Sequence, residues 1–160
     1  MNIGTPIAIL GSFKVEELDV SDIANRITEL KLTNGYDPIN GSKLKRLIIG
    51  KESDSNTAML SSSFEGLELF TGLEEIDIQG FENITNLDLA NLINLKKLNA
   101  SRSGLTTFIP ADGVNLVEVK LPGCITTIQL NNANIQTLNY TPTSTLRNLL
   151  LNNVNWDLQK

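Results

Sequence analysis

A six-residue phrase, apolar-x-x-apolar-x-apolar, recurs about every ten or eleven residues along this chain. Fixed-period repetition of this kind is typical of a solenoid, in which each unit buries its apolar side chains against the next. The phrase therefore says how the chain is built, and it says little about activity. The clearest copies are Leu73-Ile76-Ile78, Ile84-Leu87-Leu89, Leu95-Leu98-Ala100, Leu116-Val119-Leu121, Ile125-Ile128-Leu130, Ile135-Leu138-Tyr140 and Leu146-Leu149-Leu151.

These copies form two interleaved ladders, so that one coil takes about 21 residues and contains two short strands. Within each phrase the fourth and sixth positions alternate with polar residues, which is the pattern of a strand with one buried face. We therefore expect a mainly β fold of short parallel strands with little helix. The first positions are Ile84, Leu105, Ile125 and Leu146 on one ladder, and Leu73, Leu95, Leu116 and Ile135 on the other.

The phrase continues upstream with less regularity, and we interpret residues 1–160 as a single repeat domain. Residues 1–14 would form an N-terminal edge or cap, residues 15–151 the repeats, and residues 152–160 a C-terminal edge or cap. Residues 33–42 are predicted to be an irregular connection, and residues 50–63 an insertion at one edge of a coil. Residues 57–70 could hold a short helix instead of a further copy. Pro110 takes the sixth position of the unit that starts at Leu105, so this unit should pair on one side only or end early.

The segment Leu95-Lys-Lys-Leu-Asn-Ala-Ser-Arg-Ser-Gly-Leu105 resembles a leucine-rich repeat, L-x-x-L-x-L-x-x-N-x-L. The resemblance covers roughly Val15 to Leu151 and is closest to the short-repeat, internalin-like bacterial type. It implies a right-handed, leucine-rich-repeat-like solenoid. The Asn- and Thr-rich style also resembles repeats in virion proteins of crAss-like bacteriophages. The usual Asn ladder is largely missing, because the family's Asn position is Phe81, Leu92, Ser103, Gly113, Cys124, Ala133, Thr143 and Val154 here.

The distribution of charge excludes several classes of partner. Residues 1–80 contain 7 basic and 13 acidic residues, a net −6, whereas residues 81–160 contain 6 and 5, a net +1. No basic stripe is present, so we expect no nucleic-acid binding. The segment from Met1 to Phe13 contains no signal-peptide pattern and no run long enough for a membrane span, so we expect no membrane insertion. The compartment is left open, with a virion as one possibility.

Catalytic chemistry finds little support in the sequence. The chain has no His, the usual general base and zinc ligand. Glu75, Asp77 and Asp88 could neighbour one another, but strand faces of a solenoid are open to solvent, and we interpret these carboxylates as a solvated acidic face. The single Cys, Cys124, is interpreted as a small buried residue at a corner. We expect no enzyme activity, no catalytic or metal site, and no cofactor.

Two parts of the predicted surface could contact a protein partner. The outward fifth positions of one ladder are Asp88, Ile109, Gln129 and Leu150, which include two aliphatic side chains. Scattered surface aliphatics are also normal in soluble proteins, so this face need not bind anything. At the C-terminal end, Trp156 and Leu158 either cap the last coil or meet another chain.

We therefore expect a non-enzymatic protein-interaction or structural module whose surface or ends contact another protein, with a bacteriophage virion component as its most specific form. The alternative is a bacterial surface module that binds carbohydrate or a receptor, favoured by the exposed Asn, Thr and Gln. Sugar rings are usually bound by stacking on aromatic side chains. The chain has only 8 aromatic residues, and this scarcity counts against the alternative.

Overall fold

The computed structural model describes residues 5–8, 15–22, 27–31, 43–50, 66–143 and 145–156, of which 5–8 and 27–31 are described by their backbone alone. The predicted connection at residues 33–42 and nearly all of the predicted insertion at 50–63 lie outside these residues, as does Leu158. The strands are β1 (Thr5–Ala8), β2 (Glu17–Asp19), β3 (Ile27–Lys31), β4 (Arg46–Ile48), β5 (Glu75–Asp77), β6 (Lys97–Asn99), β7 (Thr107–Phe108), β8 (Asn115–Leu121), β9 (Thr127–Asn131), β10 (Asn134–Tyr140), β11 (Asn148–Asn152) and β12 (Asn155–Trp156).

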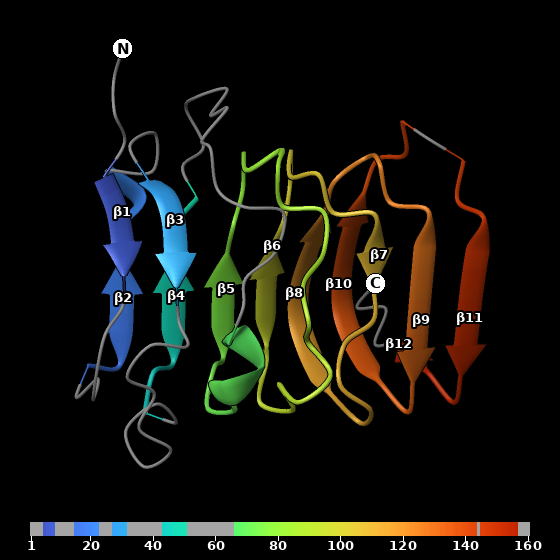
Figure 1. Ribbon diagram of the computed structural model, residues 1–160. Helices are drawn as coiled ribbons and strands as arrows, with labels where there is room; N and C mark the ends of the chain where they lie inside the picture. The colour runs from blue at the N-terminus through green and yellow to red at the C-terminus, as the bar shows by residue number, and fades with distance from the viewer. Residues whose placement is uncertain are drawn as a thin grey trace.

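All strand pairs are parallel, and they form a stacked β-solenoid (Figure 1). One sheet has the order β12-β10-β8-β6-β5-β4-β2, and a second has the order β11-β9-β7. A two-stranded sheet of β1 and β3 lies at the N-terminal end, where its strands run in the same direction as those of the second sheet. The strands of the seven-stranded sheet run the opposite way, because the chain turns back between one sheet and the other. The predicted two-strand coil is confirmed.

The fourth residues of the phrase lie side by side along the seven-stranded sheet. Register pairs Leu18 with Leu47, then Ile76, Leu98, Val119 and Leu138. We call such a set of paired positions a column. From Ile76 onward the steps along this column match the coil length that the sequence predicts. The two steps before Ile76 are longer, at 29 residues each, from position 18 to 47 and from 47 to 76.

The second sheet follows the same rule. Phe108 pairs with Ile128, and Ile128 with Leu149. Strand β7 is only two residues long and pairs with β9, while Pro110 forms a single bridge to Leu89. The predicted early end of this unit is therefore observed. Its cause is the missing N–H of proline, which cannot donate to the next strand.

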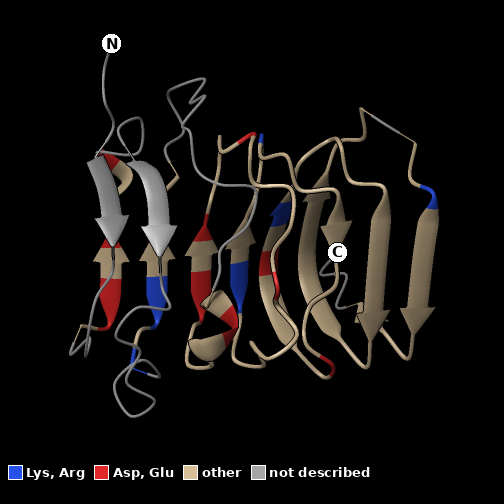
Figure 2. Ribbon diagram, viewed as in Figure 1, with Lys and Arg blue, Asp and Glu red and all other residues tan. Residues whose placement is uncertain are grey.

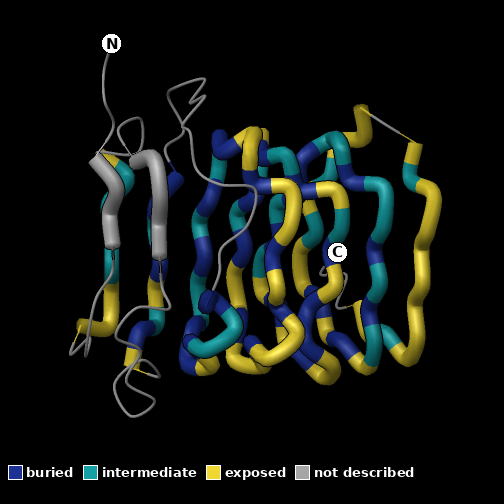
Figure 3. The backbone as a smooth tube through the Cα atoms, in the orientation of Figure 1, coloured by how far each residue is buried: buried dark blue, intermediate teal, exposed yellow. Residues whose placement is uncertain are grey.

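The apolar columns form one continuous core between the sheets (Figure 3). The Phe70, Phe81 and Phe108 side chains are at most 2% exposed and fill the largest spaces. Among the described residues, helix is limited to short 3-10 turns such as η2 (Leu67–Leu69), and the rest of the segment predicted as a possible helix, residues 57–65, lies outside them. Each buried aliphatic side chain contributes about 1.5–3 kcal/mol before the entropic cost of ordering the chain.

The corners of the coil repeat a left-handed backbone conformation. Gly113, Asn132 and Asn153 all have positive φ, at 77°, 50° and 51°. The N–H of Gly113 donates to Asn131 O, and that of Asn132 donates to Asn152 O, so these three residues are aligned from coil to coil. Glycine and asparagine are the residues that tolerate this conformation best. The assignment of Gly113 to the family's Asn column is wrong: Val114, which is fully buried, aligns with Ala133 there.

Candidate functional site

The outer face of the seven-stranded sheet carries charges whose sign alternates from strand to strand (Figure 2). Two columns run across this face. One contains Glu16, Lys45, Glu74 and Lys96, and the other contains Glu17, Arg46, Glu75, Lys97 and Glu118. Opposite charges directly across neighbouring strands stabilise their pairing, and like charges destabilise it. The alternation therefore favours the observed register.

The ion pairs between strands are present in the structure. Arg46 donates from Nε to Glu75 at 2.9 Å and from Nη1 to Glu17 at 2.6 Å. Glu74 lies 2.6 Å from Lys96 Nζ and 3.5 Å from Lys45 Nζ. The hydrogen bond from Lys96 is the main cause that holds the pKa of Glu74 below its ordinary value. Because the charges are already paired within the chain, this face offers no strong single-sign field to a partner.

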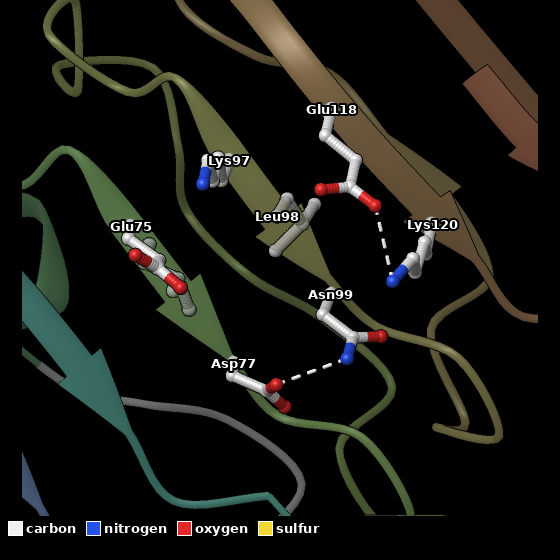
Figure 4. A pocket seen from close by; sticks show the side chains of 8 residues that line it. Glu75, Asp77, Lys97, Leu98, Asn99, Glu118 and Lys120 are labelled. Carbon is white, nitrogen blue, oxygen red and sulfur yellow. Dashed lines mark hydrogen bonds and ion pairs between the residues drawn. The ribbon is translucent and has the colours of Figure 1, made fainter. Parts of the chain in front are cut away.

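A shallow hollow of about 120 Å³ lies on this face over β5, β6 and β8 (Figure 4). Asp77 lies at its edge, where Asn99 Nδ2 donates to Asp77 Oδ2 at 2.9 Å and Gln79 N–H donates to Oδ1 at 2.9 Å. Burial raises the pKa of Asp77 above its ordinary value, and these two hydrogen bonds oppose the shift. Lys120 pairs with Glu118 at 3.0 Å on β8, across the hollow from β5 (Figure 4).

The carboxylates considered from the sequence do not form a catalytic pair. Glu75 is bound to Arg46, and Asp77 is bound to Asn99 and Gln79. Asp88 lies outside the seven-stranded sheet, where it accepts a hydrogen bond from the Ala90 N–H. None of these groups lines an enclosed cleft, and the arrangement serves strand pairing.

The outward residues predicted on the second sheet lie where the sequence placed them. Leu150 pairs with Gln129 across β11 and β9. Ile109 follows β7 and is 39% exposed, and Leu150 is 55% exposed. Asp88 is exposed beside the bridge from Leu89 to Pro110. These four residues line one face at successive coils, but only Leu150 is continuous with a larger apolar surface.

That larger surface is the C-terminal end of the solenoid. Leu149 continues the column of Phe108 and Ile128, which are 0% and 3% exposed, yet Leu149 itself is 53% exposed. Leu151 continues the column of Leu130 and is 46% exposed against 0%. Both side chains belong to columns of the core, and no further strand among the described residues covers them.

Trp156 has the same relationship to the other sheet. It pairs with Ile135, which is 1% exposed, and is itself 36% exposed. We define the open end as the set of inward-facing side chains at this end of the core: Leu138, Tyr140, Leu149, Leu151, Val154 and Trp156. All of β11 is exposed, as its uniform colour in Figure 3 shows. From the sequence, Trp156 was predicted either to cap the last coil or to meet another chain, whereas Leu149 and Leu151 were predicted to be core residues.

Two columns of asparagine side chains run along the solenoid and reach the open end. Asn153 donates from Nδ2 to Asn132 Oδ1 at 2.8 Å, and Asn132 donates to Asp112 Oδ1 at 2.8 Å. A second outward column contains Asn115, Asn134 and Asn155. These amide columns lie outside the core. Residues 145–156 contain one arginine and no carboxylate, so the open end is apolar with a largely uncharged margin.

Other kinds of site find no support in the described part of the chain. No group of three or more His, Cys, Asp or Glu residues could hold a metal ion there. Cys124 is partly buried and directs its Sγ at the carbonyl oxygens of Leu105 and Ser103, at 3.3 and 3.5 Å. Among the same residues, no helix is long and apolar enough to cross a membrane.

Comparisons with protein-family models, with curated proteins and with solved structures find no match to this chain. The fold and its chemistry therefore carry the functional argument.

Proposed function

We propose that this chain is a non-enzymatic protein-interaction or structural module that contacts another protein through its open end. The observation that supports this most is the exposure of Leu149, Leu151 and Trp156, which occupy columns whose other members are buried. A strand edge with apolar side chains beside it is a surface that binds other β-structure, and proteins that leave it free usually protect it by charge. The strands of the open end carry no such charge.

The finer form of the proposal is a leucine-rich-repeat-like virion component of a bacteriophage. Its support is the resemblance of the Asn- and Thr-rich phrase to such repeats, together with a solenoid that could be built into a larger assembly. The carbohydrate-binding alternative is less well supported, because Phe70, Phe81 and Phe108 are buried and leave few aromatic faces on the described sides of the solenoid.

The experiment compares an end variant with a variant of a lone surface aliphatic. Ile93 is 63% exposed and lies away from the open end, so Ile93→Asp is the matched control for Leu149→Asp. A dye that fluoresces on apolar surfaces should bind the dilute wild-type protein and Ile93→Asp, and should bind Leu149→Asp much less. Equal and weak dye binding by all three proteins would contradict the proposal, since the open end would then not be an accessible apolar surface.

A further inference from the structure

We infer that β11 accepts one extended strand of a partner protein, parallel to itself, with an acidic side chain beside Arg147. This inference rests on the proposed function and names the chemistry of the partner for one part of the open end. Strand β12 pairs with β10 in the other sheet, so it does not occupy the edge of β11. Among the described residues, β11 has a strand on one side only, and we call its other side the free edge (Figure 1).

The backbone of β11 leaves hydrogen-bonding groups on the free edge. The Asn132 N–H donates to the carbonyl oxygen of Asn152, so Asn152 directs its backbone groups towards the preceding coil. These groups alternate along a strand, and those of Leu149 and Leu151 therefore point away from β9. A parallel strand on the free edge would bond to them, which is the recognition mode called β-strand addition.

The columns of the core set the apolar positions of the accepted strand. Ile128 and Leu130 of β9 have β11 beside them and are 3% and 0% exposed. Leu149 and Leu151 continue the same two columns and are 53% and 46% exposed. An accepted strand with apolar side chains at these two alternate positions would cover both leucines as β11 covers the residues of β9.

Arg147 sets the charge of the accepted strand. It directly precedes β11, is exposed, and forms no ion pair with another described residue. Lys45 has the equivalent place before β4, because each follows the first apolar residue of its phrase. The carbonyl oxygen of Lys45 accepts the N–H groups of Glu74 and Glu75 from the next coil, and Lys45 Nζ lies 3.5 Å from the Glu74 carboxylate.

The same arrangement can form beside Arg147, because the backbone repeats it there. The N–H groups of Arg147 and Asn148 both donate to Thr126 O, as two N–H groups of the next coil donate to Lys45 O. The residue of the accepted strand that aligns with Arg147 would therefore stand where Glu74 stands beside Lys45. An acidic side chain at that position would be attracted to Arg147, and a basic one would be repelled. The partner strand is thus acidic-x-apolar-x-apolar.

The probe is a peptide with blocked ends that copies residues 125–132 and is made in three forms. Thr126 is the residue that would align with Arg147, so the forms carry the native threonine, Thr126→Glu or Thr126→Lys. Each is titrated into the wild-type protein and into Arg147→Glu. The control protein is Arg102→Glu, which makes the same change of net charge in an earlier coil. Circular dichroism spectra that match the wild type establish that both variants are folded.

Amide hydrogen exchange, resolved by residue with nuclear magnetic resonance, gives the readout. The Leu149 and Leu151 amides should exchange rapidly in the free protein and slowly with bound peptide, because the accepted strand would bond to them. Wild type should bind the Thr126→Glu form about twofold to fivefold more tightly than the Thr126→Lys form, as expected for an exposed ion pair. Arg147→Glu should reverse this order, and Arg102→Glu should keep it.

Failure of the inference can be told apart from failure of the proposed function. If no peptide slows exchange at Leu149 and Leu151 at millimolar concentration, while the dye still binds the open end, strand addition at β11 is wrong and the proposed function stands. An order of affinities that is the same in wild type and Arg147→Glu would overturn the acidic partner strand. Weak dye binding by the wild type would overturn both, because the open end would not be an accessible apolar surface.

Discussion

Asn99 on β6 donates a hydrogen bond to the carboxylate of Asp77 on β5 at 2.9 Å, which joins two neighbouring coils through their outward side chains. Despite this bond the pKa of Asp77 is raised above its ordinary value of 3.8, and burial is the main cause. The contribution of Asp77 to stability is therefore fully present below 3.8 and is lost as pH rises through the higher folded pKa. The stability of Asp77→Asn, relative to wild type, should increase as pH rises from below 3.8 to neutrality. Urea unfolding midpoints across this range measure the change, and a relative stability that falls with pH would contradict it.

Glu74 should show the opposite pH dependence. Its folded pKa lies below the ordinary value of 4.5, chiefly because Lys96 donates a hydrogen bond to it. Its stabilising contribution is present above 4.5 and is lost as pH falls through the folded pKa. Glu74→Gln should therefore be less stable than wild type at neutral pH, and the difference should vanish in acid. The same urea series measures both variants, so Glu74→Gln serves as the control of opposite sign for Asp77→Asn.

The facing of the strands can be tested on β6. Leu98 is 1% exposed, and its neighbour Lys97 is exposed on the outer face. Leu98→Asp buries an unpaired charge and should cost several kcal/mol of unfolding free energy, whereas Lys97→Gln should change it by roughly 0.5 kcal/mol or less. Chemical denaturation followed by circular dichroism measures both. Similar losses in the two variants would mean that the assigned inner and outer faces are wrong.

The alternating charges predict a salt-dependent effect at Glu75. Glu75→Lys would place three positive side chains in a row, from Arg46 through position 75 to Lys97. The thermal midpoint of this variant should fall at low salt and should recover much of the difference at about 1 M salt, where the Debye length is about 3 Å. Glu82→Lys, an exposed change outside the column, is the control. A loss at Glu75 that is unaffected by salt would exclude the charge explanation.

Gly104 should not tolerate a side chain. A Cβ at this position would clash with the backbone carbonyl oxygen of Glu82, which belongs to the preceding coil. Gly113 has φ of 77° and open space where a Cβ would lie, so Gly113→Ala costs only backbone strain, about 1–2 kcal/mol. Gly104→Ala should therefore lower the unfolding free energy more than Gly113→Ala does, as urea unfolding of the two variants measures. The reverse order would contradict the close stacking of these coils.

The repeat phrase predicted most of the fold because its period and alternation depend on contacts that every coil repeats. The columns of Leu98 and Ile128 follow directly from that phrase. The alternating charges were missed because strands far apart in the sequence must first be aligned before Arg46 is seen between Glu17 and Glu75. Once the ladders are aligned, the change of sign at each step is visible in the sequence.

The open end was only partly predicted, for a related reason. Leu149 and Leu151 match the phrase as well as any core residue, and the phrase alone does not show which copy is the last to be covered. Trp156 was selected because it lies beyond the last copy. That Trp156 belongs to the column of Ile135 is known only from the pairing of β12 with β10. Strand β12 has two residues, which is too short a pattern to align from the sequence.

The accessibility of Trp156 tests the open end most directly, and it is the only tryptophan of the chain. Its fluorescence can be titrated with a neutral soluble quencher at a series of protein concentrations, with light scattering on the same samples. An open end predicts efficient quenching in dilute protein and protection that grows as larger species form. Protection of Trp156 in a sample shown to be monomeric would contradict the account, because the last coil would then be covered by its own chain.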